Sequence, residues 1–191
     1  MSRNNLYPIF LKTSSLHILI VGGGNVALEK LSFLIKSSPD SNIEMVAPWF
    51  LEATEELAIE HGIKCVKRPY DASFLVHKHI VIATTDQDNV NKEVYHECRK
   101  RNILVNLADN PDYCDFYMGG IVTKGDVKVA ISTNGRSPTT AKRLRQFFED
   151  VLPNDIDALV KNLHLYRKTI KGDFEQKVEK LNEFTKSLVE K

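Results

Sequence analysis

Short apolar runs alternate with amphipathic stretches along the first hundred residues of the chain. The apolar runs lie at about 17–21, 43–47, 63–66, 80–83 and 103–108, and hydrophobic positions with helical spacing follow most of them. Runs that are apolar at successive positions are typical of parallel strands that are buried on both faces. The order of these elements therefore predicts an α/β fold with a parallel sheet covered by helices.

A glycine-rich turn follows the first apolar run. Residues 22–27 read Gly-Gly-Gly-Asn-Val-Ala, which matches Gly-x-Gly-x-x-Ala, and a helical pattern begins at once. In such a unit Gly22 permits the tight turn and Gly24 lets the backbone approach a pyrophosphate. The helix start offers the N–H groups of Asn25 and Val26 to that anion. A turn without a ligand is the alternative for the motif alone, but its place after the first strand favours a Rossmann-like dinucleotide site.

The pattern changes after Asn110. Segments 116–121 and 127–132 are predicted strands, and Ser137-Pro138 is expected to open a helix, with serine as its N-cap. Two amphipathic helices follow. We predict an NAD-binding Rossmann-like domain over 1–113, a small α+β dimerisation and substrate-cleft segment over 114–150, and a C-terminal helical domain over 151–191.

Composition and charge narrow the possible classes of protein. The chain is 42% hydrophobic and 27% charged, with a formal net charge of +1, so nothing global points to nucleic acid or a membrane as a partner. The start of the chain lacks the apolar segment of a signal peptide, and three separated cysteines are expected to be reduced thiols in a cytoplasmic protein. His77 and His79 stand close together without a nearby cysteine or carboxylate, and no metal site is expected.

Ordered motifs over nearly the whole chain carry a resemblance. They are Tyr7-Pro8-Ile9-Phe10-Leu11, the glycine turn with Lys30, Arg68-Pro69-Tyr70, Ile82-Ala83-Thr84-Thr85-Asp86 with Asn91, Val105-Asn106-Leu107-Ala108-Asp109, and the stretch from Val129 to Pro138. Dinucleotide-binding folds in general lack the last of these. On these residues the chain resembles the precorrin-2 dehydrogenase family, the stand-alone form of the dehydrogenase half of siroheme synthase.

The resemblance implies NAD-dependent oxidation of precorrin-2 to sirohydrochlorin in siroheme biosynthesis, by a homodimer joined through the middle region. One alternative stays open within the family: a bifunctional enzyme that also inserts Fe²⁺ into sirohydrochlorin. A more remote alternative is a non-catalytic NAD-sensing module whose C-terminal helices bind a partner.

The resemblance also implies a catalytic residue. Asp109 directly follows the fifth predicted strand, at the carboxyl edge of the sheet where ligands bind in this fold. The family's acid at this place is implicated in catalysis, so Asp109 is expected to be a general base or a proton relay. The alternative is a structural aspartate that caps the Asn110-Pro111 turn.

Substrate binding is expected in the loop that closes the last motif. By the resemblance, Thr133 lies near the tetrapyrrole, with Asn134, Arg136 and Ser137 as further contacts; an ordinary loop hydroxyl is the alternative for Thr133. The stretch 124–145 contains six basic residues and one acidic residue. Such a cationic segment suits a substrate with eight carboxylates, whereas a solvated helix face is the alternative for its single members.

The cofactor site departs from the usual NAD pattern in one place. The acid expected about 20 residues past the glycines is missing, and Ala47-Pro48-Trp49 stands there instead. Because the family shares this lack, backbone groups at Pro48 and Trp49 are expected to face the adenosine ribose. The choice of NAD over NADP is implied by the resemblance and not by these residues. Thr84 and Thr85 are expected to line the nicotinamide side, with loop hydroxyls as the alternative.

Overall fold

The structure, a computed structural model, describes residues 4–108 and 110–186 of the chain and separates into two compact units. The first unit ends at Met118 and also contains Thr133–Ser137. The second comprises Gly119–Ser132 and the residues from Pro138 onward. The predicted three-part division, with boundaries after residues 113 and 150, stays a prediction. The contacts between residues end the continuous part of the first unit at Met118.

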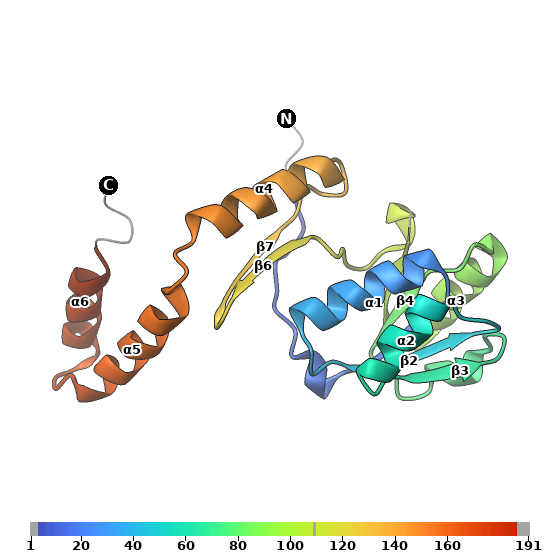
Figure 1. Cartoon of the computed structure of the whole chain (residues 1–191), viewed down its shortest axis with the longest axis horizontal. Helices are drawn as coiled ribbons and strands as arrows, with labels where there is room; N and C mark the ends of the chain where they lie inside the picture. The colour runs from blue at the N-terminus through green and yellow to red at the C-terminus, as the bar shows by residue number, and fades with distance from the viewer. Residues whose placement is uncertain (1–3, 109, 187–191) are drawn as a thin grey trace. The chain divides into compact units, whose positions relative to one another are not determined.

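The first unit is built on a five-stranded parallel sheet with the order β3-β2-β1-β4-β5 (Figure 1). Its strands are β1 (His17–Val21), β2 (Asn42–Ala47), β3 (Lys64–Lys67), β4 (Ile80–Ala83) and β5 (Leu104–Leu107). The helices between them are α1 (Asn25–Ser37), α2 (Glu52–Glu60) and α3 (Asp88–Lys100), with short 3₁₀ turns η1 (Thr13–Ser15), η2 (Ala72–Leu75) and η3 (Pro111–Tyr113). The predicted α/β fold with a Rossmann-like parallel sheet is confirmed.

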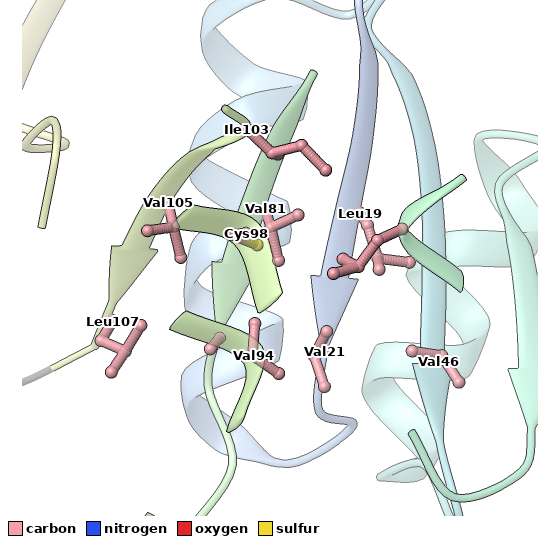
Figure 2. Packing of buried hydrophobic residues seen from close by; sticks show 11 residues of the cluster. Leu19, Val21, Val46, Val81, Val94, Cys98, Ile103, Val105 and Leu107 are labelled. Carbon is pink, nitrogen blue, oxygen red and sulfur yellow. The ribbon is translucent and has the colours of Figure 1, made fainter. Parts of the chain in front are cut away.

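Both faces of the sheet are buried, which explains why its strands are apolar at successive positions. Ile18 and Ile20 of β1 point to one face and pack with Leu31 of α1 and Ala58 of α2. The neighbouring residue Leu19 points to the other face. There the core also contains Val94 and Cys98 of α3 and Leu75 of η2, as the close-up of the labelled residues shows in part (Figure 2). Burial of such side chains stabilises the fold by about 1.5–3 kcal/mol each.

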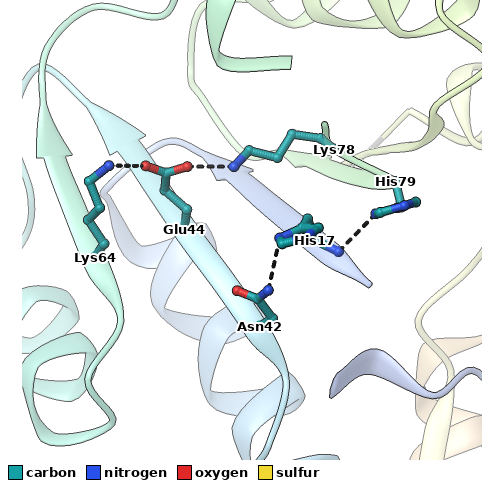
Figure 3. A network of polar contacts seen from close by, with 6 residues as sticks. All are labelled: His17, Asn42, Glu44, Lys64, Lys78 and His79. Atoms are coloured by element: carbon teal, nitrogen blue, oxygen red, sulfur yellow. Dashed lines mark hydrogen bonds and ion pairs between the residues drawn. The ribbon is translucent and has the colours of Figure 1, made fainter. Parts of the chain in front are cut away.

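A polar network lies at the amino ends of the strands, opposite the glycine turn (Figure 3). Glu44 of β2 accepts hydrogen bonds from Lys64 Nζ at 2.7 Å and Lys78 Nζ at 2.5 Å. Nearby, the backbone N–H of His17 donates to His79 Nδ1 at 3.0 Å, and the two rings stack with centroids 5.5 Å apart. Side chains from three neighbouring strands and from the residues before β4 are therefore tied together at this edge.

The second unit begins with the antiparallel strands β6 (Gly120–Lys124) and β7 (Val127–Ile131), followed by α4 (Pro138–Val151), α5 (Ile156–Thr169) and α6 (Phe174–Thr185). The expectation of a strand over 116–121 is wrong at its start. Asn106 Nδ2 donates to the carbonyl oxygen of Phe116 at 2.8 Å, so this residue is held beside β5 instead of in the hairpin. Gly119 is needed next to the hairpin because a Cβ there would lie 2.2 Å from the Ile131 carbonyl oxygen.

Helix α4 covers the hairpin with one side and leaves an apolar side exposed. Ala141 is buried, whereas Phe147 is 56% exposed and Val151 is 57% exposed. Within a single chain, the apolar side of α4 is therefore only partly covered.

Candidate functional site

The topology places the glycine turn at the switch point of the sheet. From β1 the chain runs outward through β2 to β3, and then crosses to β4 and β5 on the other side of β1. Loops after β1 and β4 therefore diverge, and ligands of doubly wound sheets bind in the crevice at this point, outside the carboxyl ends of the strands. The strand hydrogen bonding continues into these loops: Gly22 N donates to Val46 O at 2.9 Å, and Thr84 N donates to Val21 O at 2.8 Å.

The three glycines of the turn have different surroundings. Gly22 has φ +127°, and a Cβ there would lie 2.3 Å from Thr84 Oγ1. A Cβ on Gly23 would lie 2.2 Å from the Trp49 carbonyl oxygen. In contrast, a Cβ on Gly24 would meet only the Trp49 ring, at an ordinary 3.7 Å. The first two glycines are thus required by the protein's own packing, and the space beside Gly24 is open for a ligand.

Gly23 is a residue that the motif alone did not single out. Its carbonyl oxygen accepts a hydrogen bond from Leu51 N at 2.8 Å, just before α2 begins. This contact joins the turn after β1 to the turn after β2, and no spacing in the sequence predicts it.

The start of α1 is shaped to receive an anion. Gly24 is its N-cap, no side chain of the described residues caps it, and its first turn contains no acidic residue. Asn25 is exposed and Val26 is half-buried at this start. Helix starts of this kind, with N–H groups not used within the helix, bind phosphate groups. Pro48 and Trp49, which follow β2, are both exposed, with 61% of Trp49 accessible beside the turn.

The hydroxyls of Thr84 and Thr85 both have partners within the protein. Thr84 is buried, and its Oγ1 donates to Val21 O at 2.9 Å, which joins β4 to β1 at the switch point. Thr85 Oγ1 lies 2.7 Å from Asn91 Oδ1, and Asn91 Nδ2 donates to Thr85 O at 2.8 Å. Both threonines lie on the loop after β4, so their expected place beside the nicotinamide stays a prediction, and their hydroxyls also shape that loop.

Asp109 lies outside the described residues, but the backbone on each side of it is held by hydrogen bonds. Ala108 N donates to Ala83 O at 2.9 Å, and Cys114 Sγ lies 3.2 Å from Leu107 O and 3.3 Å from Asn110 O. Burial raises the pKa of the Cys114 thiol, which keeps it protonated as a donor to these carbonyl oxygens. No pattern in the sequence indicates this role for Cys114.

Residues 133–137 form a tight loop that groups with the first unit. Thr133 Oγ1 donates to Ser137 O at 3.1 Å and accepts from Ser137 N at 3.3 Å. Asn134 and Gly135 both have positive φ, of 56° and 71°. The structure therefore brings Thr133, Asn134, Arg136 and Ser137 together in one turn, in which the threonine hydroxyl helps to fix the shape.

The basic residues of segment 124–145 differ in their contacts. Lys124 Nζ donates to Leu152 O, and Arg145 pairs with Glu149 one helical turn along α4. Arg143 contacts Gln146 at 3.1 Å. Lys142 is exposed, with no ion pair to any residue in the described part of the chain. Some of the basic side chains that the charge pattern assigned to substrate binding therefore contact other groups of the protein itself.

The described residues also bear on metal sites and on membrane-spanning segments. Residues 4–108 and 110–186 contain no group of three or more His, Cys, Asp or Glu placed to hold a metal ion. Within the same ranges, every helix is too short or too polar to cross a lipid bilayer.

Comparison with known proteins identifies the class. The sequence model of a family described as putative NAD(P)-binding matches residues 9–120, and that of the sirohaem biosynthesis protein central segment matches residues 124–150. The first match covers more than half of the chain, so the protein belongs to the putative NAD(P)-binding family. The dinucleotide-binding role predicted from the glycine turn is confirmed at this level.

The relatives confirm the kinship that the motifs indicated. Siroheme synthases of Pseudoalteromonas atlantica and Hydrogenovibrio crunogenus are 35% and 38% identical to the chain over 168 residues. These matches include 88% and 86% of this chain, but 36% and 35% of the two relatives, so the chain spans about a third of their length. A solved structure of SirC, a precorrin-2 dehydrogenase, shares the fold with a TM-score of 0.75 and 21% identity, over 93% of this chain and 88% of that one.

Proposed function

We propose that this protein oxidises precorrin-2 to sirohydrochlorin with NAD⁺, as a dehydrogenase of siroheme biosynthesis. The observation that carries the proposal is the open glycine turn at the switch point of an NAD(P)-binding sheet, in a chain whose next segment matches the sirohaem biosynthesis central family. The siroheme synthase relatives and the fold shared with a precorrin-2 dehydrogenase support the same substrate class.

In this proposal the first unit binds the dinucleotide. The N–H groups of Asn25 and Val26 hold the pyrophosphate beside Gly24, where the structure leaves room for a ligand. Pro48 and Trp49 face the adenosine ribose from the end of β2. Thr84 and Thr85 lie on the nicotinamide side, where their hydrogen bonds to Val21 and Asn91 keep the loop after β4 in place. With no acid after β2 to bind the ribose, the backbone of the turn supplies a larger share of cofactor affinity.

The chemistry requires one hydride acceptor and one proton acceptor. A hydride leaves a carbon of the macrocycle for the nicotinamide of NAD⁺, and a proton leaves the macrocycle at the same time or afterwards, so that NADH and H⁺ form with sirohydrochlorin. We assign the proton to the Asp109 carboxylate. Its position in the sequence, directly after β5 and Ala108, supports this role because the loops that follow the strands of such a sheet bind the ligands.

The substrate's carboxylates are assigned to the loop of Thr133, Asn134, Arg136 and Ser137. The turn presents one guanidinium and several backbone groups close together, and guanidinium–carboxylate pairs are strong and directional. The exposed Lys142 of α4 adds positive charge in the same stretch of sequence.

We also propose that the protein is a cytoplasmic homodimer joined through residues 114–150. The exposed apolar side of α4, with Leu144, Phe147 and Val151, supports an interface there because large exposed apolar patches mark association surfaces.

The decisive assay is anaerobic formation of NADH from NAD⁺ and precorrin-2 by the purified protein. Appearance of NADH together with sirohydrochlorin is the expected result. Tight NAD⁺ binding without turnover would instead favour the non-catalytic NAD-sensing module. The same preparation incubated with sirohydrochlorin and Fe²⁺, without NAD⁺, shows whether iron insertion exceeds its spontaneous rate.

A further inference from the structure

The two C-terminal helices line an open cationic pocket that the proposed reaction does not use. Helices α5 and α6 are joined by a turn at Gly172, and a cavity of about 480 Å³ lies between them. Its wall includes His164, Arg167, Lys168, Asp173, Phe174 and Lys177. This volume is within the range of small-molecule sites.

Many Lys and Arg side chains of the described residues pair with an acid, whereas the basic side chains of this pocket form no ion pair. Elsewhere, Lys78 pairs with Glu44 and Lys92 pairs with Asp88. Within residues 4–108 and 110–186, neither Arg167, Lys168 nor Lys177 forms an ion pair or a side-chain hydrogen bond. Three cations line one cavity whose wall contains a single carboxylate, so they repel one another, and an anion that enters the cavity reduces this repulsion.

The single carboxylate in the wall is committed to its own helix. Asp173 is the N-cap of α6, and its side chain accepts a hydrogen bond from Gln176 N at 2.9 Å. The turn before it needs glycine: Gly172 has φ +128°, and a Cβ there would lie 2.3 Å from Gln176 Oε1. The acid therefore shapes the turn, and its single negative charge leaves the three cations with an excess of two positive charges.

An apolar ring completes the wall. The side chain of Phe174 is 70% exposed at the start of α6. A ligand that suits both features carries negative groups on an apolar body, so that the charges meet the cations while the body covers the ring.

We propose that the pocket between α5 and α6 binds neighbouring carboxylates carried on an apolar body, the chemistry of a tetrapyrrole rim. The assignment of a tetrapyrrole as the source rests on the proposed function, whereas the pocket's preference for carboxylates does not. A free small polycarboxylate is the second source of the same chemistry.

The test is a titration of the full-length ¹⁵N-labelled protein followed by amide NMR spectra, because the readout is resolved by residue. One arm uses uroporphyrin, a stable macrocycle with eight carboxylates that is already aromatic and donates no hydride. The other arm uses citrate. We expect uroporphyrin to shift amides in 164–177, and higher salt to weaken that binding. Shifts of the same residues by citrate at equal concentration would identify a free polycarboxylate as the occupant.

A charge-matched pair of variants completes the design. Arg167→Gln/Lys177→Gln removes two cations from the pocket and is expected to weaken binding at 164–177 by about tenfold or more. Lys12→Gln/Lys36→Gln removes two exposed cations from the first unit and is expected to leave it unchanged. Absence of shifts in 164–177 in both arms, or equal affinity of the two variants, overturns the proposal. If the natural protein shows these NMR shifts but forms no NADH from NAD⁺ and precorrin-2, the result would count against the proposed function alone.

Discussion

A Cβ atom on Gly22 would lie 2.3 Å from the hydroxyl oxygen of Thr84, which in turn donates to Val21 O at 2.9 Å. The two residues directly follow the neighbouring strands β1 and β4 at the switch point of the sheet, although 61 residues separate them in the chain. The tight turn after β1 and the loop after β4 are therefore built against each other. This contact closes the base of the proposed cofactor site.

The glycine turn yields the first prediction. Gly23→Ala is expected to destabilise the protein by about 2 kcal/mol or more, because its Cβ would clash with the backbone of Trp49. Gly24→Ala is expected to stay within about 1 kcal/mol of the natural chain in denaturant unfolding.

Gly24 is expected to matter for cofactor affinity, although a small substitution there changes the stability little. Gly24→Val fills the space left for the pyrophosphate and is expected to raise the Kd for NAD⁺ about tenfold or more, as measured by calorimetry. Unchanged NAD⁺ affinity in a folded Gly24→Val protein would refute the assigned position of the cofactor.

The catalytic assignment yields the second prediction. Asp109→Asn removes the proton acceptor while keeping the size of the side chain. We expect kcat for NADH formation from precorrin-2 to fall by about a hundredfold or more, with the Kd for NAD⁺ changed less than about twofold. Asp112→Asn, an exposed acid three residues further on, is the matched control and is expected to keep its turnover. Near-normal kcat in Asp109→Asn would show that another group takes the proton.

The exposed side of α4 yields the third prediction. Phe147→Glu places a charge in the proposed homodimer interface and is expected to convert the dimer into a monomer of 21.7 kDa in light scattering. Ile59→Glu replaces an apolar residue of α2 that is 70% exposed, compared with 56% for Phe147, and is expected to leave the mass of the dimer unchanged. A mass of one chain for the natural protein would contradict the interface itself.

The network around Glu44 yields a pH-dependent prediction. Burial by itself would raise the pKa of this carboxyl, but the hydrogen bonds and charges of Lys64 and Lys78 outweigh it, and the pKa lies below its ordinary value. A carboxyl with a lowered pKa in the folded state stabilises the protein above its unfolded pKa, and this contribution is lost as the pH falls through the folded value.

Glu44→Gln is therefore expected to lower the free energy of unfolding by about 1 kcal/mol at neutral pH. The difference from the natural chain is expected to shrink as the pH falls below about 4.3, the ordinary pKa of glutamate, toward the lower folded pKa at which the natural carboxylate becomes protonated. Glu60→Gln, at an exposed position at the end of α2, is the control and is expected to show no such change. A difference that stays constant with pH would mean that packing, and not charge, is what Glu44 contributes.

Sequence patterns alone determined the class of fold and the kind of cofactor. Strands such as Ile18–Val21 and Ile80–Ala83 are apolar at successive positions because helices cover both sides of the sheet, and such runs are visible without coordinates. The glycine turn is equally local, since its special backbone and the helix that follows lie within a few residues. The siroheme kinship also followed from ordered motifs, and the family matches confirm it.

Only the tertiary structure determined the contacts between segments that lie far apart in the chain. It shows that Gly23 lies against the backbone of Trp49, that the Thr84 hydroxyl donates to Val21 O, and that Asn106 holds Phe116 beside β5 and outside the hairpin strand. It also brings the unpaired cations of α5 and α6 to one cavity. The periodicity of the sequence indicates which face of an element is buried. Only the folded chain determines which atoms are in contact on that face. These contacts distinguish the hydroxyls and glycines that the structure itself requires from those that are open to a ligand.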